Sequence, residues 1–292
     1  MHKLDEMMTA RRYMTMMLSA FLMFAVFTSW AEAFDGGESS TRLSEAGIAG
    51  FQQFTAAEHH RAFAIAPGGV WAWVSGHATT ETAEAEALKA CRQYTQQPCH
   101  VYAVNDQVVF DENTWLTSWK LNTTTANLSD AAVGLGRGQR FPDLALTSPE
   151  GRPVALGDLR GKPVFLHFWG SWCPPCKAEF ADLQNLYDAL AGDDIISFVF
   201  VQGREPIAKS KRWADKNGFN MPLYDSGHQG RGDKAYRLAD RETIADRRLA
   251  AVYPSTYVLD ADGLVVFHQS GPGVQWGQYE NLIRYLASNV TQ

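Results

Sequence analysis

The sequence predicts an α/β protein in which a small α+β domain precedes a larger α/β domain. Residues 163–169 form an apolar run that leads directly into an amphipathic stretch over residues 174–190, which is the pattern of a buried strand followed by a helix. A second apolar run at residues 195–201, a helical pattern at 207–217 and a short strand at 221–224 continue this alternation. Their order suits a βαβ unit.

The first 33 residues predict an export signal. Arg11 and Arg12 precede a nearly continuous apolar run over residues 14–30, and the small residues Ala31 and Ala33 fit the rule for signal-peptide cleavage. Cleavage is expected after Ala33. The alternative is an uncleaved membrane anchor, because the run is just long enough to span a bilayer if it is tilted. Either way, the folded part is expected in an oxidising, extracytoplasmic compartment such as the periplasm.

Residues 34–120 predict the small α+β domain. Strands are expected at residues 62–66 and 70–75, on either side of a Pro-Gly-Gly turn, and a helix is expected at residues 80–94. A further strand begins at Cys99 and is followed by an Asn-Asp turn into another short strand. These residues carry no chemical motif, so the partner of this domain stays unknown.

All four cysteines lie beyond the predicted export signal and fall into two pairs. Cys91 ends the predicted helix of the small domain, and Cys99 opens the next strand. A disulfide between them is expected to act as a structural staple that contributes about 2.5 kcal/mol in the chain-entropy model. The alternative is a second redox pair that relays electrons to Cys173.

Residues 121–140 are rich in Thr, Asn, Ala and Gly, and they predict a linker to the larger domain at residues 141–292. Within the larger domain, residues 226–251 are rich in glycine and in charged residues. We expect a solvated helix with balanced charges there. The alternative is a segment that borders the active site and steers acidic partners through its arginines, which are Arg231, Arg237, Arg241, Arg247 and Arg248.

A redox dithiol is predicted at the junction between the apolar run and the first helix of the larger domain. Two residues separate Cys173 from Cys176, so their sulfurs meet within one helical turn and can cycle between dithiol and disulfide. At the helix start, unpaired N–H groups and the positive end of the helix dipole favour a thiolate at Cys173. Cys173 is therefore expected to attack and Cys176 to resolve. A zinc half-site is the alternative, but no second Cys pair or spaced His pair follows in this domain, so no metal or other cofactor is expected.

Two separated motifs in the larger domain resemble the TlpA/ResA group of thioredoxin-like proteins. The first comprises residues 141–144, 156–163 and 168–176, and the second comprises residues 253–260 and 263–266. Two distant motifs in the same order make the resemblance specific, and it covers about half of the chain. The resemblance implies a thioredoxin-like fold, in which a central mixed sheet is flanked by helices.

The resemblance also implies a substrate site beside the dithiol. Tyr253 and Pro254 match the cis-proline loop, which in that family packs beside the CxxC motif and offers backbone to an extended substrate segment. Trp172, which directly precedes the first cysteine, is expected to contribute to the same site.

One position departs from the thioredoxin pattern. His167 stands where thioredoxins carry a buried aspartate. An imidazole near the dithiol is a candidate to accept the proton of Cys176 during exchange, and the alternative is a packed, hydrogen-bonded core residue. Glu179 is expected as a solvated charge near the start of the helix that complements its dipole.

The sequence therefore predicts an exported thiol-disulfide oxidoreductase that reduces disulfides in extracytoplasmic proteins. The resemblance implies electrons from a membrane thiol-transfer protein and a role in cytochrome c maturation or metallocentre assembly. The alternatives are a disulfide oxidase or isomerase on the same scaffold, a redox-sensing adaptor, or a copper carrier that uses Cys173, Cys176 and His268. A net charge of −6 and the lack of a basic cluster exclude nucleic acid as a partner.

Overall fold

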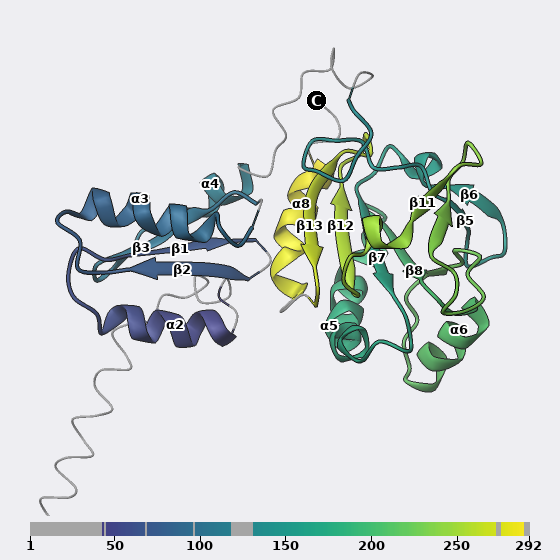
Figure 1. Ribbon diagram of the computed structural model, residues 1–292, viewed down its shortest axis with the longest axis horizontal. Coiled ribbons are helices and arrows are strands. Elements are labelled where there is room, and N and C mark those ends of the chain that lie inside the picture. Colours follow the sequence, from purple (N-terminus) through teal and green to yellow (C-terminus); the bar gives the residue numbers. More distant parts are fainter. Residues whose placement is uncertain are drawn as a thin grey trace, which may run out of the picture. The chain divides into compact units, whose positions relative to one another are not determined.

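The computed structural model describes residues 43, 45–67, 69–95, 97–117, 131–272 and 276–288 (Figure 1). The predicted signal peptide or anchor at residues 1–33 lies outside the described residues, as do residues 118–120 of the predicted small domain and residues 121–130 of the predicted linker. Within the described part of the chain, no helix is both long and apolar enough to cross a membrane.

The first group of elements is an antiparallel sheet with helices. Its strands follow the spatial order β2-β1-β3-β4. The elements are α2 (Glu45–Thr55), β1 (Ala62–Ala66), β2 (Val70–Val74), α3 (Thr80–Cys91), β3 (His100–Val104), β4 (Gln107–Val108) and α4 (Glu112–Thr117). The helices α2 and α4 are additional to those that the sequence predicts.

The two faces of β1 pack against different partners. Its three alanines cluster with Ala83 and Ala87 of α3, and such small side chains let a helix approach a sheet closely. Phe63 points to the opposite face, where its ring contacts those of Phe54 in α2 and Tyr102 in β3. Successive side chains of a strand point to opposite faces, so β1 packs against α3 with its alanines and against α2 with Phe63.

A disulfide joins the end of α3 to the start of β3. Cys91 is the last residue of α3, Cys99 immediately precedes β3, and their Cα atoms lie 6.2 Å apart. The separation of eight residues along the chain closes a short loop. The covalent link therefore holds the helix to the sheet at one end of the small-residue face.

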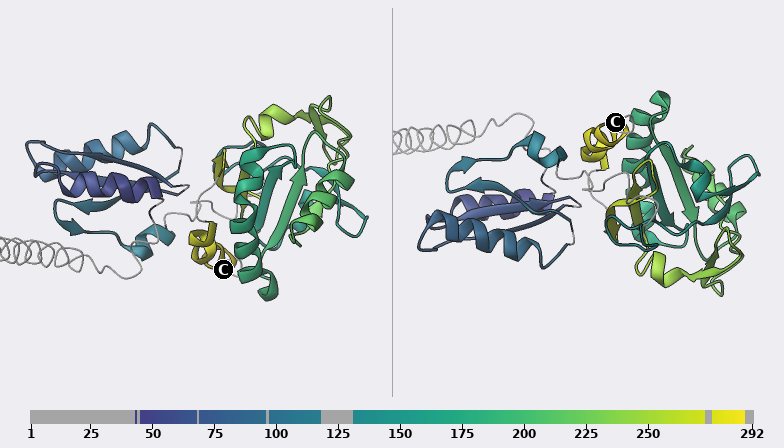
Figure 2. Two further views of the ribbon diagram at one scale, coloured as in Figure 1. Left: turned by 90° about the horizontal axis from the view of Figure 1, so that it is seen from below. Right: turned by 90° about the horizontal axis from the view of Figure 1, so that it is seen from above.

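The second group of elements contains a five-stranded mixed sheet in the order β13-β12-β7-β8-β9 (Figures 1 and 2). Strands β7, β8 and β9 are parallel, whereas β12 and β13 run antiparallel to their neighbours. The elements are β5 (Ala145–Thr147), β6 (Pro153–Ala155), β7 (Val164–Trp169), α5 (Pro174–Leu190), β8 (Ser197–Gln202), α6 (Ile207–Lys216), β9 (Leu223–Tyr224), β10 (Ala235–Arg237), β11 (Thr243–Ala245), α7 (Asp246–Leu249), β12 (Ser255–Leu259), β13 (Val265–Ser270) and α8 (Glu280–Ser288).

The central strand β7 is buried along its whole length, as expected for a strand with neighbours on both sides and layers on both faces. On one face, Trp169 contacts Phe180 of α5, and α5 in turn packs against α8. On the other face, Phe168 contacts Tyr236 of β10 and Tyr257 of β12. The mixed sheet flanked by helices is the fold class that the sequence predicts for this half.

The described end of the predicted linker, residues 131–140, is bound to the sheet rather than free. The backbone N–H of Gly138 donates to the carbonyl of Val265 in β13 at 2.8 Å, and Arg140 forms a bridge with Leu264. The edge strand β13 offers unpaired backbone groups, and this segment satisfies some of them.

The expectation of a solvated helix at residues 226–251 is wrong. The segment forms the β10–β11 hairpin and the single-turn helix α7. Its glycines and the β-branched pair Thr243–Ile244 disfavour a continuous helix and suit a hairpin. Tyr236 of β10 is fully buried against β7, so the hairpin covers one face of the central sheet.

Candidate active site

The dithiol lies where β7 passes into α5. Cys173 is the N-cap of α5 with extended backbone angles, and Pro174 is the first helical residue, where a missing N–H carries no penalty. Cys173 and Cys176 are joined in a disulfide with their Cα atoms 5.3 Å apart. The backbone N–H of Cys176 also donates to Sγ of Cys173 at 3.3 Å. The helix start therefore directs an N–H group and the positive end of its dipole at this sulfur.

The two cysteines differ in access. Cys176 is completely enclosed, whereas Cys173 keeps 2% of its surface exposed beside the exposed ring of Pro174. Only Cys173 therefore presents any surface to an incoming disulfide.

The segment before β12 closes one side of the dithiol. The Tyr253–Pro254 peptide bond is cis, and the carbonyl oxygen of Tyr253 lies 3.6 Å from Sγ of Cys173. Ser255, the first residue of β12, pairs with Phe168 near the end of β7. The antiparallel pairing of these two strands brings Pro254 to the sheet edge from which the dithiol loop leaves.

Aromatic rings form the surface next to Cys173. The Trp172 ring meets the Tyr253 ring edge-on with centroids 5.2 Å apart, and its Nε1–H donates to the carbonyl of Gly203 at 2.8 Å. The hydroxyls of Tyr253 and Tyr236 lie 2.9 Å apart. A Cβ on Gly203 would stand 2.4 Å from the Tyr253 hydroxyl and 2.7 Å from that of Tyr236. The two hydroxyls therefore leave room only for glycine at position 203, directly after β8.

His167 occupies a fully buried position on β7 and faces α5. Its Nδ1 lies 2.8 Å from the Thr256 hydroxyl, and its Nε2 lies 3.4 Å from Oε1 of Glu179. Burial lowers the pKa of His167 to about 3, which keeps the ring neutral at physiological pH.

Glu179 is not the solvated charge that the sequence suggests. It is 5% exposed, and its Oε2 accepts a hydrogen bond from Nε1–H of Trp276 at 3.1 Å. Glu179 follows Cys176 by three residues, so it lies on the face of α5 that packs against the sheet. Helical spacing alone could have predicted this burial.

Residues 137–268 match the model of the AhpC/TSA family, a span that contains both the dithiol and Pro254. The thioredoxin-like protein YneN of Bacillus subtilis is 28% identical over 150 residues, covering 51% of this chain and 78% of YneN. The thiol-disulfide oxidoreductase ResA of Geobacillus thermodenitrificans is 28% identical over 144 residues, covering 49% of this chain and 74% of ResA. Over its C-terminal half, the chain is a thioredoxin-like thiol-disulfide oxidoreductase similar to ResA.

Solved structures with similarity to this chain also cover about half of it. StoA of Bacillus subtilis is 21% identical and covers 49% of this chain and 95% of its own, with a TM-score of 0.36. A thioredoxin-family thiol:disulfide interchange protein of Chlorobium tepidum is 19% identical and covers 51% of this chain and 95% of its own, with a TM-score of 0.38.

The structure brings Cys173, Cys176, Trp172 and the Tyr253–Pro254 bond together at one edge of the thioredoxin-like sheet. His268, the third residue of the copper hypothesis, instead stacks on the ring of Tyr257 with centroids 4.1 Å apart. Among the residues that the structure describes, no group of three or more His, Cys, Asp or Glu side chains is arranged to hold a metal ion. The copper hypothesis therefore gains no support from the described residues.

Sequence reasoning missed Glu205, which organises the loop before the dithiol. Its carboxylate is 2% exposed and accepts hydrogen bonds from the backbone N–H of Ser171 at 2.6 Å and from the Ser171 hydroxyl at 2.7 Å. It also accepts from the Ser210 hydroxyl at 2.7 Å and pairs with Lys209 at 3.2 Å. Ser171 directly precedes Trp172, so this buried carboxylate holds the backbone segment that leads into Trp172 and Cys173.

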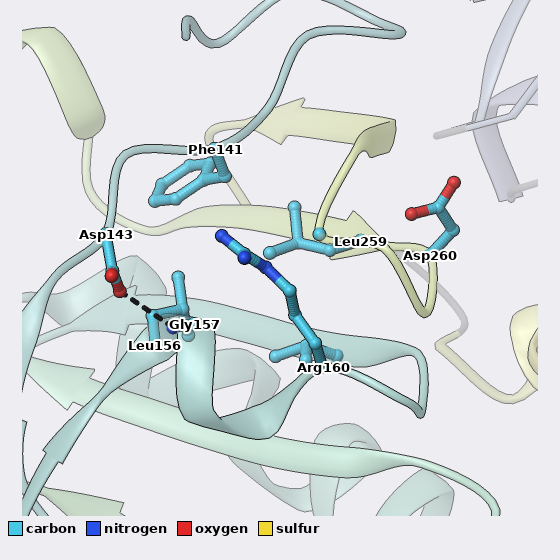
Figure 3. A pocket seen from close by; sticks show the side chains of 9 residues that line it. Phe141, Asp143, Leu156, Gly157, Arg160, Leu259 and Asp260 are labelled. Carbon is cyan, nitrogen blue, oxygen red and sulfur yellow. Dashed lines mark hydrogen bonds between the residues drawn. The ribbon is translucent and has the colours of Figure 1, made fainter. Parts of the chain in front are cut away.

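A small pocket lies at the other end of the thioredoxin-like sheet (Figure 3). Val164 begins β7 and Leu259 ends β12, whereas the dithiol follows the opposite end of β7. The pocket is therefore separate from the redox site. Its lining includes Phe141, Asp143, Leu156, Arg160 and Asp260.

We expect His167 to make the stability of the domain dependent on pH. The folded pKa of about 3 lies below the ordinary value of 6.5, so the unfolded chain binds more protons between these values and stability falls as pH falls. Between pH 7 and pH 5, this group alone should lower the free energy of unfolding by about 2 kcal/mol.

The measurement is urea unfolding of the wild type and of His167→Asn at several pH values. The variant lacks the titrating ring, so its free energy of unfolding should fall less steeply below pH 7. Equal slopes for the two proteins would contradict the neutral, desolvated state of His167.

Proposed function

We propose that this protein is an exported thiol-disulfide reductase that acts on disulfides of extracytoplasmic proteins. The observation that supports it most directly is Cys173 at the N-cap of α5, with an N–H group on its sulfur and the cis Tyr253–Pro254 carbonyl beside it. The predicted export signal at residues 1–33 supports the compartment. In this proposal, residues 34–120 form a separate domain stapled by Cys91–Cys99, and residues 141–292 carry the chemistry.

The proposed reaction is a two-step exchange. The Cys173 thiolate attacks one sulfur of the substrate disulfide, which forms a mixed disulfide and releases the other substrate sulfur as a thiolate that takes up a proton. The Cys176 thiolate then attacks Sγ of Cys173, which releases the second substrate thiol and leaves the Cys173–Cys176 disulfide. Two electrons from a dithiol donor must restore the reduced form. We propose a membrane thiol-transfer protein as that donor.

The substrate in this proposal binds in an extended conformation beside Pro254, against the rings of Trp172 and Tyr253. Haem-site cysteines of apocytochrome c and cysteines of metallochaperones are the proposed substrates. His167 is proposed to assist proton transfer through its contact with Glu179, since both lie buried on facing elements.

The reduction potential of the Cys173–Cys176 pair tests the direction of electron flow. The protein carrying Cys91→Ser and Cys99→Ser is equilibrated with dithiothreitol or glutathione buffers, so that only one pair titrates. A value near or below about −270 mV is expected for a reductase. A value near about −120 mV, that of a strong oxidant, would instead support the alternative of a disulfide oxidase.

A further inference from the structure

Arg204 lies over both aromatic rings beside Cys173. Its guanidinium carbon is 5.9 Å from the centre of the Trp172 ring and 5.3 Å from that of Tyr253, both within range of a cation–π interaction. Trp172 adjoins Cys173 in sequence, and the carbonyl of Tyr253 approaches its sulfur. The arginine therefore occupies the rim that a substrate beside Pro254 would meet.

The position of Arg204 is set by residues 226–251 and by its own backbone. Its φ of +60° is in the left-handed region, which is costly for a residue with a side chain. Its backbone N–H donates to Nδ1 of His228 at 3.0 Å, and Nε2 of His228 lies 2.8 Å from the carbonyl oxygen of Ala235. Because Ala235 begins β10, the β10–β11 hairpin holds this strained residue in place.

Residues 226–251 also orient the Arg204 side chain. Nε of Arg204 donates to Oδ2 of Asp246 at 2.5 Å, and its Nη2 contacts the same oxygen. The Asp246 side chain is 2% exposed, whereas that of Arg204 is 18% exposed. Within the described residues, Nη1 of Arg204 makes no hydrogen bond or ion pair, so a guanidinium edge remains for another acceptor.

A second arginine adds to the positive charge of this rim. Arg247 is exposed on α7, and its Nη1 donates to the carbonyl of Ala251, two residues before Tyr253. Burial raises the pKa of Tyr253 to about 12, and the charges of Arg204 and Arg247 act in the opposite direction. The nearby carboxylates of Asp246 and Glu205 are buried and already paired.

We infer that Arg204 and Arg247 are specificity-determining residues, which select substrates that carry an aspartate or glutamate next to the reacting cysteine. A guanidinium matches a carboxylate in shape and charge, and the pairing gains strength where rings exclude water. Successive residues of an extended peptide are about 3.4 Å apart and their side chains alternate between two faces, so a residue that flanks the cysteine lies beside the sulfur, within reach of long side chains on the rim. This inference rests on the proposed function, since it names the substrate class of that same site.

The test compares three synthetic disulfide peptides that differ only in the residue next to one cysteine, which is Asp, Asn or Lys. Pre-reduced, full-length protein is mixed with each peptide, and the second-order rate constant of a single turnover is measured. The wild type should reduce the Asp peptide about tenfold faster than the Asn peptide, as one hydrogen-bonded charge pair allows. The Lys peptide should react slowest, and added salt should reduce the differences in rate constant between the three peptides.

The variants assign this preference to the two arginines. Arg247→Gln should lower the Asp-to-Asn rate ratio severalfold, and Arg204→Gln should bring it close to one, while Arg204→Lys should keep part of it. Arg248→Gln removes an exposed arginine at the next position of α7 and should leave the ratio unchanged.

Equal rates of the wild type on the Asp and Asn peptides would overturn the inference and leave the proposed function intact. An Arg248→Gln effect as large as that of Arg247→Gln would also overturn it, because the overall positive charge of this surface would then explain the preference. Failure of the wild type to reduce any of the peptides would count against the proposed function itself.

Discussion

Replacing Cys173 with serine should lower the rate of disulfide reduction by about 10³-fold or more, because the hydroxyl lacks the nucleophilicity of the thiolate. Cys176→Ser should be equally inactive in turnover but should accumulate a mixed disulfide with the substrate. Cys173 attacks first in the proposed reaction, and without Cys176 nothing releases the adduct. Mass spectrometry of the protein under non-reducing conditions after mixing with a disulfide peptide detects that adduct.

The matched control is the double variant Cys91→Ser/Cys99→Ser. It removes the Cys91–Cys99 disulfide and should cost about 2.5 kcal/mol of stability in the proposed small domain, while the reduction rate stays close to that of the wild type. A large loss of rate in this control would favour the alternative of an electron relay to Cys173. An adduct on Cys173→Ser rather than on Cys176→Ser would reverse the assigned order of attack.

Replacing Glu205 should have the second largest effect, and it should act on stability and activity together. In Glu205→Gln, an NH2 group replaces one carboxylate oxygen. This group donates and cannot accept a hydrogen bond, so at least one donor from Ser171, Ser210 or Lys209 loses its partner. We expect a loss of about 2 kcal/mol for Gln and about 4 kcal/mol for Ala, which also leaves a cavity. The reaction should slow as well, since Ser171 leads into Trp172 and Cys173.

Urea unfolding followed by tryptophan fluorescence measures the loss, and single-turnover reduction measures the rate. Glu242→Gln is a suitable control, because Glu242 is exposed in the same half of the chain and its replacement should change stability by less than about 0.5 kcal/mol. A Glu205→Gln protein as stable as this control would show that the buried carboxylate does not organise the loop.

The features that sequence predicts well are those whose cause is local. The strand at residues 163–169 and the helix at 174–190 appear as Val164–Trp169 and Pro174–Leu190, because continuous burial and helical spacing show directly in the residue pattern. The solvated helix expected at residues 226–251 fails for the converse reason. Tyr236 is buried by its contact with Phe168, which lies 68 residues earlier, and no local pattern encodes that contact.

The two buried carboxylates, Glu179 and Glu205, differ in the same way: one depends on local spacing and the other on a long-range contact. Glu179 lies on the packed face of its helix, and its spacing of three residues from Cys176 already contained this information. Glu205 instead depends on Ser171, which is 34 residues away, so its role emerges only when the end of β8 comes beside the dithiol loop.

The sequence by itself determined the dithiol and its helix start, because only two residues separate Cys173 from Cys176 and the groups that act on the sulfur belong to the same turn. Only the tertiary structure decided what surrounds that sulfur. Tyr253 arrives from 80 residues away, and Arg204 is held by Asp246 from 42 residues away. Contacts at such separations form only when strand pairing and burial bring the segments together, and they depend on the packing of the whole domain rather than on any local run of residues.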